Sequence, residues 1–262
     1  MIVSWSSGIP DDNMDEGILV ALRNTVSRHP WWTARAALAL ALLRQRGILP
    51  PASILEAGCG WGTNFERLET AGYKITGLDI SWKTLAQLDR PDRQFIEADL
   101  SRNLPDDLPL YDCVLALDVI EHIDDDSHAL RQLARLVKPT GCIIVSVPAL
   151  PELYSEFDDV QGHRRRYTVE SLTACLEGAG LVVEDTLWWG QWMVGLLRRR
   201  RTRDRRRPGD TAVDVYRRYL ALPPWPAPWL MGLMFRIDRW RTLHRRNVIG
   251  TSLIAVAVRP SA

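Results

Sequence analysis

The chain has 262 residues, of which 46% are hydrophobic and 25% charged, and its formal net charge is +1 at pH 7. This length is sufficient for one α/β domain with a complete core, and it leaves room for an insertion. The small net charge gives no overall field that would favour nucleic acid as a partner. No run approaches the ~18 apolar residues that a membrane span requires.

The cysteines and the first residues indicate a cytoplasmic protein. Cys59, Cys113, Cys142 and Cys175 form no C-x-x-C pair, and three of them lie in or beside apolar runs typical of strands. Buried free thiols in a reducing compartment are therefore expected, without disulfides. The first ten residues lack the basic and apolar parts of a signal peptide.

The N-terminal part, residues 1–50, is predicted to be a helical cap. Residues 1–12 are predicted to be a loose arm, and a first helix is expected over about residues 15–28. A second helix is expected over residues 31–43, which are rich in strong helix formers. Because this second helix is too apolar to lie free in solvent, we expect it to pack on the core.

A strand–helix pattern then runs through residues 51–189, and residues 249–262 supply one more core strand. The predicted strands are Ser53–Ala57, Lys74–Leu78, Gln94–Ala98, Cys113–Leu117, Cys142–Val147, Leu181–Trp188 and Thr251–Val258. Ser81 and Thr168 are expected to cap the helices that follow them. Ser171, three residues after Thr168, is not expected to complete a capping box.

The segment of residues 190–248 is predicted to be an arginine-rich, helical lid inserted before the last strand. Arg198–Arg207 contains eight arginines and one aspartate, and an amphipathic helix is expected near Leu230–Leu243. A solvated loop is the simpler interpretation of the arginine run. The alternative is that residues 190–246 contact a membrane surface or a lipid-linked acceptor. Nucleic acid is not expected, because nothing else in the chain is both basic and aromatic.

A glycine-rich turn follows the first strand of the core. Glu56 ends the apolar run, and Gly58, Gly60 and Gly62 follow at alternate positions. Such a strand–turn–helix unit binds anionic or nucleotide-like ligands in parallel α/β sheets, and glycine permits close approach of the backbone. The third glycine comes one residue too early for the fingerprint of a dinucleotide site, which argues against NAD.

Acidic residues end the next two strands. Asp79 stands 21 residues after Gly58, where a carboxylate accepts hydrogen bonds from both hydroxyls of a ribose. Asp99, beside the apolar Leu100, is placed to accept from the exocyclic amine of adenine. Glu56 is able to accept from a ligand ammonium group or from N–H groups of the loop. These residues predict a ligand with an amine, a ribose and an adenine.

Together these residues resemble the class I S-adenosylmethionine-dependent methyltransferases. The similar segments are Glu56–Gly62, Leu78–Ser81, Ala98–Leu100, Tyr111–Leu117 and Val137–Cys142. The resemblance covers about residues 29–189 and 249–259. It implies a Rossmann-like α/β fold with a seven-stranded sheet of order 3-2-1-4-5-7-6, an antiparallel last strand and helices on both faces. It implies S-adenosyl-L-methionine as cofactor, bound by Glu56, Gly58, Cys59, Gly60, Gly62, Asp79, Ile80, Asp99, Leu100 and Leu117.

A narrower resemblance points to a bacterial branch that acts on small molecules. It is carried by Ser146–Ala149, Leu153–Ser155, Asp158, Gly162–Tyr167, His29–Trp32 with Arg35, and Ile249–Leu253. The residues then expected to bind the substrate are Trp31, Trp32, Tyr154, Arg166 and Tyr167, and the aromatic rings among them suit a planar or apolar acceptor. The alternative for each of these rings is packing in the core or lid, with Trp31 and Trp32 as a hydrophobic staple. Trp61 departs from this branch, in which the glycine turn has a small residue, and Glu56 stands where aspartate is common.

Methyl transfer requires the acceptor atom about 3–3.5 Å from the activated methyl group, and a proton-bearing acceptor also benefits from a general base. The candidates are His122, just past the fourth strand, with its neighbour Glu121, and His163, on the long connection over residues 150–167. The alternative for His122 is a helix-start residue bonded to Glu121 or to the backbone. The alternative for His163 is an anchor of its loop.

A metal site is a further alternative. Asp118, Glu121 and His122 resemble a cluster in the ubiquinone O-methyltransferases, where a divalent cation binds near a catechol. Polar residues at a helix start explain the same pattern more simply, so no metal is expected.

The sequence therefore predicts a methyltransferase that acts on an oxygen or nitrogen of an aromatic or apolar small molecule. Two alternatives remain open. One is methylation of carbon on an electron-rich ring, and the other is a cofactor-binding, membrane- or partner-associated module without transfer activity. A homodimer also remains open.

Overall fold

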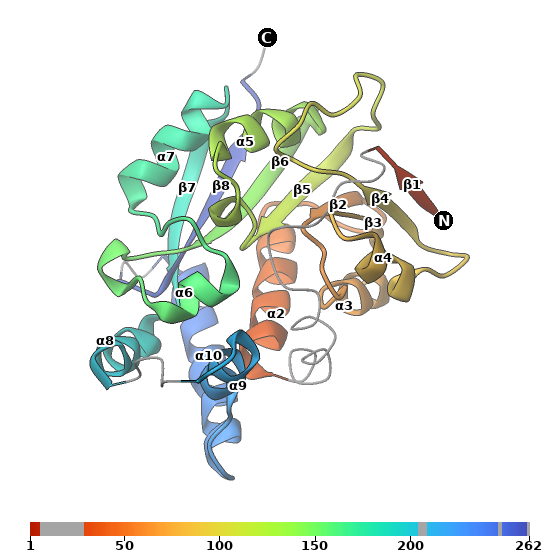
Figure 1. Ribbon diagram of the computed structural model, residues 1–262. Coiled ribbons are helices and arrows are strands. Elements are labelled where there is room, and N and C mark those ends of the chain that lie inside the picture. The colour runs from red at the N-terminus through yellow and green to blue at the C-terminus, as the bar shows by residue number, and fades with distance from the viewer. Residues whose placement is uncertain (6–28, 204–208, 246–247, 261–262) are drawn as a thin grey trace.

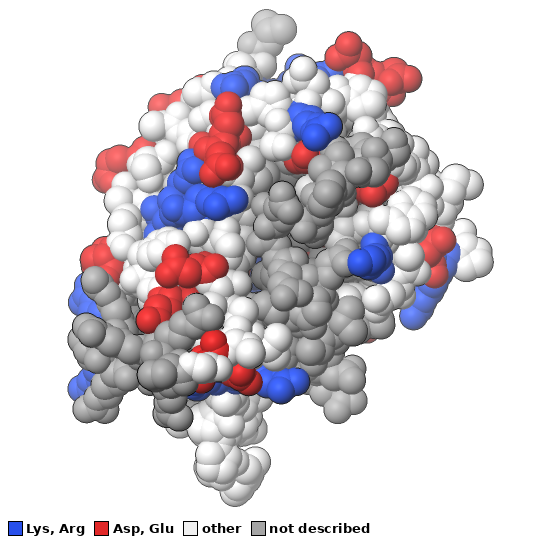
Figure 2. Space-filling view, in the orientation of Figure 1, with Lys and Arg blue, Asp and Glu red and all other residues white. Residues whose placement is uncertain are grey.

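The computed structural model describes residues 1–5, 29–203, 209–245 and 248–260. Its centre is one sheet with helices on both faces (Figure 1). On the face drawn in Figure 2, basic and acidic residues are interspersed over the described surface. The helix expected over residues 15–28 lies outside the described residues, as does part of the arginine run.

In the described parts of the chain the sheet has eight strands, one more than predicted. In the order β1-β4-β3-β2-β5-β6-β8-β7, they are β1 (Ile2–Ser4), β4 (Gln94–Glu97), β3 (Lys74–Asp79), β2 (Ser53–Ala57), β5 (Tyr111–Leu117), β6 (Val137–Pro148), β8 (Ser252–Val258) and β7 (Val182–Trp189). The seven strands from β2 onward have the predicted order. The last strand, β8, is antiparallel to both β6 and β7, and the other pairs are parallel.

The prediction of a loose arm was wrong for Ile2–Ser4. This segment pairs with β4 in parallel, with Ile2 opposite Phe95, and Phe95 N donates to Met1 O at 3.0 Å. An edge strand leaves a row of backbone groups without partners, and an extended tripeptide is enough to satisfy them. The predicted number of seven strands is therefore corrected to eight.

Two helical layers cover the sheet. The helices are α2 (Pro30–Gln45), α3 (Phe65–Thr70), α4 (Trp82–Leu88), α5 (Asp126–Arg135), α6 (Glu156–Gln161), α7 (Val169–Gly178), α8 (Val194–Arg203), α9 (Ala212–Leu220) and α10 (Ala227–Leu243). One face of the sheet packs on α5 and α7, and the other packs on α2 and α10. The central strands are buried on both sides, as their nearly continuous apolar runs predict.

The two predicted helix caps are present, and one is stronger than predicted. Ser81 Oγ accepts from Thr84 N at 3.3 Å. Thr168 N donates to Ser171 Oγ at 2.9 Å while Ser171 N donates to Thr168 Oγ1 at 3.2 Å, so the capping box is complete. The prediction was wrong because serine replaces the usual Glu or Gln of this motif and is still long enough to reach back.

The described residues between β7 and β8 contain three α-helices, of which only α10 was predicted as a helix. The buried side of α10 is fixed by polar contacts. Asp238 accepts from Gly190 N at 2.7 Å, and the Thr242 hydroxyl donates to Trp188 O at 2.8 Å. Burial raises the pKa of Asp238 to about 6. In the part of the chain described here, no helix is both long and apolar enough to cross a membrane.

Candidate functional site

Two cavities lie at the carboxyl ends of the parallel strands, where ligands of open α/β sheets bind. The first, named here the strand-end cavity, has an empty volume of about 830 Å³, including space open to solvent. It is lined by Gly58, Gly60, Leu78, Asp79, Ile80, Thr84, Ala98, Asp99, Leu100, Asp118, Val119, His122 and Ile123.

The glycine turn forms one wall of the strand-end cavity. Gly58 and Gly60 have φ of 62° and 47°, a backbone region that favours glycine. A Cβ atom on Gly58 would lie 2.5 Å from Val119 Cγ2, whereas a Cβ on Gly60 would meet no atom within 4 Å. Gly60 therefore faces open space, and the backbone there is accessible to a ligand.

Two carboxylates at the ends of strands stand beside this turn. Asp79 accepts from Gly60 N at 2.8 Å and from Ser81 N at 3.0 Å. Asp99 accepts from Ser101 N at 2.9 Å and from the Ser101 hydroxyl at 2.6 Å. These backbone bonds orient both side chains at the cavity wall, and each ionised carboxylate offers about four acceptor positions.

The structure brings six of the ten predicted cofactor residues to the strand-end cavity: Gly58, Gly60, Asp79, Ile80, Asp99 and Leu100. The other four, Glu56, Cys59, Gly62 and Leu117, do not line it. The Glu56 carboxylate accepts a hydrogen bond from Asn64, and burial raises the pKa of Glu56 to about 7. Cys59 packs with Phe65 in a buried cluster, and burial raises the pKa of its thiol.

The second cavity, named here the aromatic cavity, has an empty volume of about 1020 Å³ including open solvent. Its lining is His29, Trp31, Trp32, Asp118, Glu121, Pro148, Leu153, Ser155, Phe157, Gln161, His163, Arg166, Met193, Leu197, Arg200, Tyr219, Leu220, Thr251 and Ser252. Trp31, Trp32 and Arg166 were among the predicted substrate residues. The cavity suits an apolar or aromatic molecule, because most of the exposed area of its wall is apolar.

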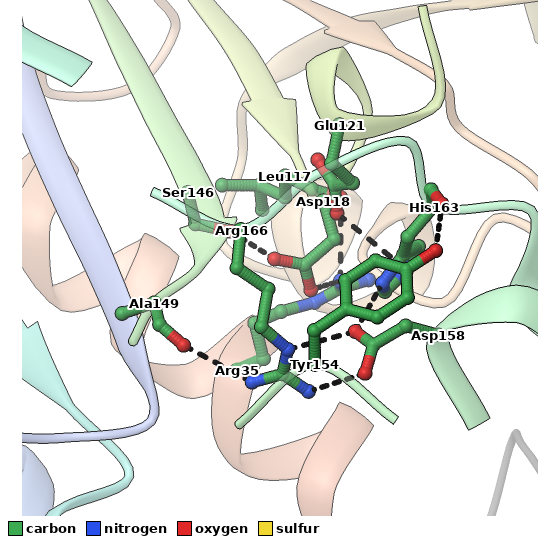
Figure 3. A network of polar contacts seen from close by, with 10 residues as sticks. All are labelled: Arg35, Leu117, Asp118, Glu121, Ser146, Ala149, Tyr154, Asp158, His163 and Arg166. Carbon is green, nitrogen blue, oxygen red and sulfur yellow. Dashed lines mark hydrogen bonds and ion pairs between the residues drawn. The ribbon is translucent and has the colours of Figure 1, made fainter. Parts of the chain in front are cut away.

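Asp118 lines both cavities. It has φ of 58°, uncommon for a residue other than glycine. Its carboxylate pairs with Arg35 of α2 and accepts from the Ser146 hydroxyl at 2.9 Å (Figure 3). Arg35 also donates to Leu117 O at 3.2 Å. Helix α2 thus fixes the position of Asp118, the residue that the walls of the two cavities share.

His163 is oriented by a buried carboxylate. Its Nδ1 lies 2.9 Å from Asp158 Oδ1, and Asp158 also accepts from Arg166 Nε at 2.8 Å (Figure 3). Burial raises the pKa of Asp158, but the hydrogen bond from His163 and the charge of Arg166 outweigh burial and leave it below its usual value. Because an ionised carboxylate only accepts, Nδ1 carries the proton in neutral His163 and Nε2 is left as acceptor.

Glu121 and His122 lie next to His163 and have buried atoms without partners. Glu121 is fully buried with Oε1 3.9 Å from His163 Nε2, and among the described residues neither of its oxygens has a hydrogen-bond partner. Burial raises the pKa of Glu121 well above its usual value, which favours the neutral form of this carboxyl. The His122 and His163 rings meet edge to face with centroids 4.8 Å apart.

Burial lowers the pKa of His122 to about 4. The metal-binding atoms that the described residues bring within 4.8 Å of one another belong to Glu121, His122 and His163. Asp118, the third ligand in the metal alternative, pairs with Arg35 instead.

Tyr154 and Tyr167, predicted to bind substrate, do not line the aromatic cavity. The Tyr154 hydroxyl lies 2.8 Å from His163 O, and burial raises its pKa to about 12. The buried Tyr167 hydroxyl donates to Asp126 at 2.7 Å, and burial raises its pKa above the usual range. Both tyrosines therefore support the loop that carries His163.

Sequence reasoning gave little weight to His29 and missed the contribution of α8 and α9. His29 caps α2 by accepting from Trp31 N at 3.1 Å, and burial lowers its pKa to about 4. Leu197 and Tyr219 reach the cavity from helices that follow β7. The only signal for His29 was its place in the motif with the two tryptophans, and α8 and α9 gave none.

The fold and the strand-end cavity define an α/β protein of the kind that binds a nucleoside at the ends of its strands. The sequence model of a methyltransferase-domain family matches residues 31–186, more than half of the chain. The chain therefore belongs to this family of S-adenosylmethionine-dependent methyltransferases.

Several relatives agree with this assignment. A Mycolicibacterium smegmatis protein whose name describes it as an S-adenosylmethionine-dependent methyltransferase is 26% identical over 97% of this chain and 100% of its own length. The malonyl-[acyl-carrier protein] O-methyltransferase of Pseudescherichia vulneris is 32% identical over 58% of this chain and 60% of its own. The ubiquinone biosynthesis O-methyltransferase of Pseudomonas syringae is 29% identical over 45% of this chain and 57% of its own length.

Solved structures share the fold. A Haloferax volcanii methyltransferase, in complex with the Trm112 methyltransferase activator, has a TM-score of 0.58 at 21% identity, over 97% of this chain and 100% of that one. The [4+2]-cyclase SpnF has a TM-score of 0.57 at 17% identity, over 90% of this chain and 85% of that one. At these identities the likeness shows the fold alone.

Proposed function

We propose that this enzyme transfers a methyl group to an oxygen or nitrogen of an apolar or aromatic small molecule held in the aromatic cavity. One observation carries the proposal: the two cavities share Asp118. His122 lies on the wall of one cavity, and its ring contacts His163 on the wall of the other. Ligands in both cavities would therefore meet beside these three residues.

The strand-end cavity fits S-adenosylmethionine. Gly58 and Gly60 would place backbone against it, Asp79 would accept from the ribose, Asp99 from the adenine amine, and Ile80 and Leu100 would contact the ring. The open space at Gly60 and the oriented carboxylates support this assignment. Glu56, Cys59, Gly62 and Leu117 would act from behind the wall by shaping the turn. The cofactor supplies an electrophilic methyl group on a sulfonium.

His163 is the better candidate for the base. Asp158 and Arg166 fix the ring and leave Nε2 as acceptor on the side of Glu121 and the aromatic cavity. His122 would remain neutral with a pKa of about 4 and would be a weak base at pH 7. Because burial favours the protonated form of Glu121, this carboxyl would donate a hydrogen bond to the acceptor and hold its reacting atom.

The nature of the cavity and the relatives favour an oxygen acceptor. Most of the exposed area of the wall is apolar and includes Trp31 and Trp32, although about half of the lining residues are polar or charged, Thr251 and Ser252 among them. Two of the relatives are named as O-methyltransferases. A planar, apolar molecule with one hydroxyl would satisfy these features.

The experiment is to follow methyl transfer without knowing the acceptor. The purified protein is mixed with S-adenosylmethionine and a metabolite extract, and mass spectrometry is used to find compounds that gain one CH₂ unit while S-adenosylhomocysteine is released. Gain on a hydroxyl or amine supports the proposal. A methyl group added to a ring carbon would instead show that the enzyme is a C-methyltransferase. Binding of S-adenosylmethionine without release of S-adenosylhomocysteine would indicate a cofactor-binding module that lacks transfer activity.

A second candidate is metal-assisted O-methylation of two neighbouring hydroxyls. It is favoured by the grouping of Glu121, His122 and His163 and by their unpartnered atoms. These three groups would hold a divalent cation, which would lower the pKa of a bound hydroxyl. Activity lost on dialysis with a chelator and restored by Mg²⁺ or Zn²⁺ would favour this candidate over a base acting alone.

A further inference from the structure

The outer face of α10 carries large apolar side chains that nothing described in this chain covers. Trp229, Leu233, Ile237 and Trp240 are 67%, 38%, 41% and 52% exposed. Their spacing of four, four and three residues places them along one side of the helix. Trp225, just before the helix, is 84% exposed and extends this apolar stripe.

The opposite face of α10 is already used by the fold. Phe235 is buried against α2 and β7, with its ring 5.8 Å from that of Trp31. Asp238 and Thr242 make the backbone contacts given above. The helix is therefore held firmly on one side, and its apolar stripe is directed away from the core.

Two basic residues of α10 flank the apolar stripe. Arg236 and Arg241 are exposed on its two sides. Residues 190–250 contain 15 arginines and four aspartates. Three of these aspartates are engaged: Asp210 pairs with Arg218, Asp214 caps α9, and Asp238 is buried. The lower end of the molecule, where the segment before α10 lies, is an uncharged projection in Figure 2.

We propose that this stripe docks on the surface of an anionic lipid bilayer, with α10 lying parallel to the membrane plane. Tryptophan is preferred at the boundary between headgroups and acyl chains, and arginines beside the apolar face attract anionic headgroups. A helix with one apolar face and a basic flank lies in the interface. Electrostatic attraction and apolar burial thus act at the same surface.

Charge and side-chain type disfavour other occupants. In a symmetric dimer through this face, the arginines that flank the stripe would be crowded against those of the second copy. Single-stranded nucleic acid stacks its bases on aromatic rings, whereas Leu233 and Ile237, in the middle of this stripe, are aliphatic. An anionic bilayer accommodates both the aliphatic and the basic side chains.

The test is flotation of the full chain with vesicles of phosphatidylcholine alone or mixed with phosphatidylglycerol. We expect the wild type to float only with the anionic vesicles, and less at high salt. Trp225→Ser with Trp229→Ser should lower the partition coefficient at least about tenfold. Arg236→Gln with Arg241→Gln should lower it about tenfold at low salt.

The matched control is Trp82→Ser, since Trp82 lies on α4 and is 47% exposed; it should float like the wild type. Calorimetry with S-adenosylmethionine checks that every variant is folded. A wild type that stays with the unbound fraction, or tryptophan variants that float unchanged, would overturn the proposal. So would a dimer that these variants dissociate, or RNA binding that they abolish. Flotation needs no methyl acceptor, so its outcome is independent of the proposed reaction.

Discussion

The two cavities share one residue and are otherwise built in different ways. The strand-end cavity takes its whole lining from residues between Gly58 and Ile123, all at or just after the ends of β2, β3, β4 and β5. The aromatic cavity takes its lining from residues between His29 and Ser252, which come from α2, three separate loops and the helices that follow β7. One cavity follows from the sheet, and the other depends on packing between distant segments.

This difference predicts how each cavity responds to change. The strand-end cavity is supported by backbone hydrogen bonds and buried strands, so a substitution in its wall should affect the affinity for its ligand and little else. The wall of the aromatic cavity depends on side chains from many elements. Substitutions there should act on the methyl acceptor and leave the cofactor unaffected.

The largest effect is expected for Asp79→Ala. The variant loses a charged acceptor that would bind two ribose hydroxyls and also leaves Gly60 N without its partner. We expect the dissociation constant for S-adenosylmethionine, measured by calorimetry, to rise about 10³-fold. The control is Asp107→Ala, on an exposed loop, which should leave this dissociation constant unchanged. An unchanged affinity in the Asp79 variant would mean that the ribose is bound elsewhere.

Glu56→Gln should change how stability depends on pH. Because burial raises the pKa of Glu56 from 4.5 in the unfolded chain to about 7, the folded protein binds an extra proton between these values. The stability that Glu56 contributes is thus complete below about pH 4.5 and is lost as pH rises through 7. Glutamine stays neutral and still accepts from Asn64.

The fall in the unfolding free energy between about pH 4.5 and 8 should therefore be smaller in Glu56→Gln by about 3 kcal/mol. Urea denaturation at the two pH values measures it. The control is Glu66→Gln, at an exposed position of α3, which should keep the wild-type pH dependence. Equal pH dependence in Glu56→Gln and wild type would show that Glu56 is ionised in the folded protein.

On the side of the aromatic cavity, His163→Gln should lower turnover about 10²-fold with unchanged affinity for S-adenosylmethionine, because the variant lacks the proposed base. Asp158→Asn should lower turnover less and shift its pH profile, since the ring remains but loses its charged partner. His244→Gln, on the exposed end of α10, is the control. A larger loss in His122→Gln than in His163→Gln would transfer the role to His122.

The smallest effect is expected for Trp32→Ala. Removing this ring from the cavity wall should raise KM for the acceptor about tenfold, with kcat and cofactor affinity nearly unchanged. Trp225→Ala, at an exposed position outside both cavities, should leave KM for a soluble acceptor unchanged. A weaker cofactor affinity in Trp32→Ala would break the separation between the two cavities.

The difference between the two cavities also explains which of their residues could be predicted from the sequence. Asp79 and Asp99 were found because the end of a parallel strand places the next residue at the cavity, a rule that depends only on local order. Glu56 belongs to the same turn, but its side chain reaches Asn64, and chain order alone does not reveal the direction of a side chain. The strand Ile2–Ser4 was missed because three residues are too few for a periodic pattern.

The aromatic cavity was predicted less well. Trp31, Trp32 and Arg166 were expected there from a resemblance. The same resemblance predicted Tyr154 and Tyr167, but these two do not line the cavity, and their hydroxyl groups form hydrogen bonds with His163 O and Asp126. Leu197 and Tyr219 had no local signal, because their place depends on how α8 and α9 pack against the loop of His163. Such contacts arise only in the folded chain.

Asp118 is also placed to link ligand binding in the two cavities, because it lines both of them. Its backbone is held at a positive φ, and its carboxylate is held by Arg35 and Ser146. If a ligand in one cavity moves this carboxylate, the affinity of the other cavity changes by a factor that is the same in both directions. Release of the methylated product and release of the spent cofactor would then be coupled events. Their order would depend on the salt bridge between Asp118 and Arg35 of α2.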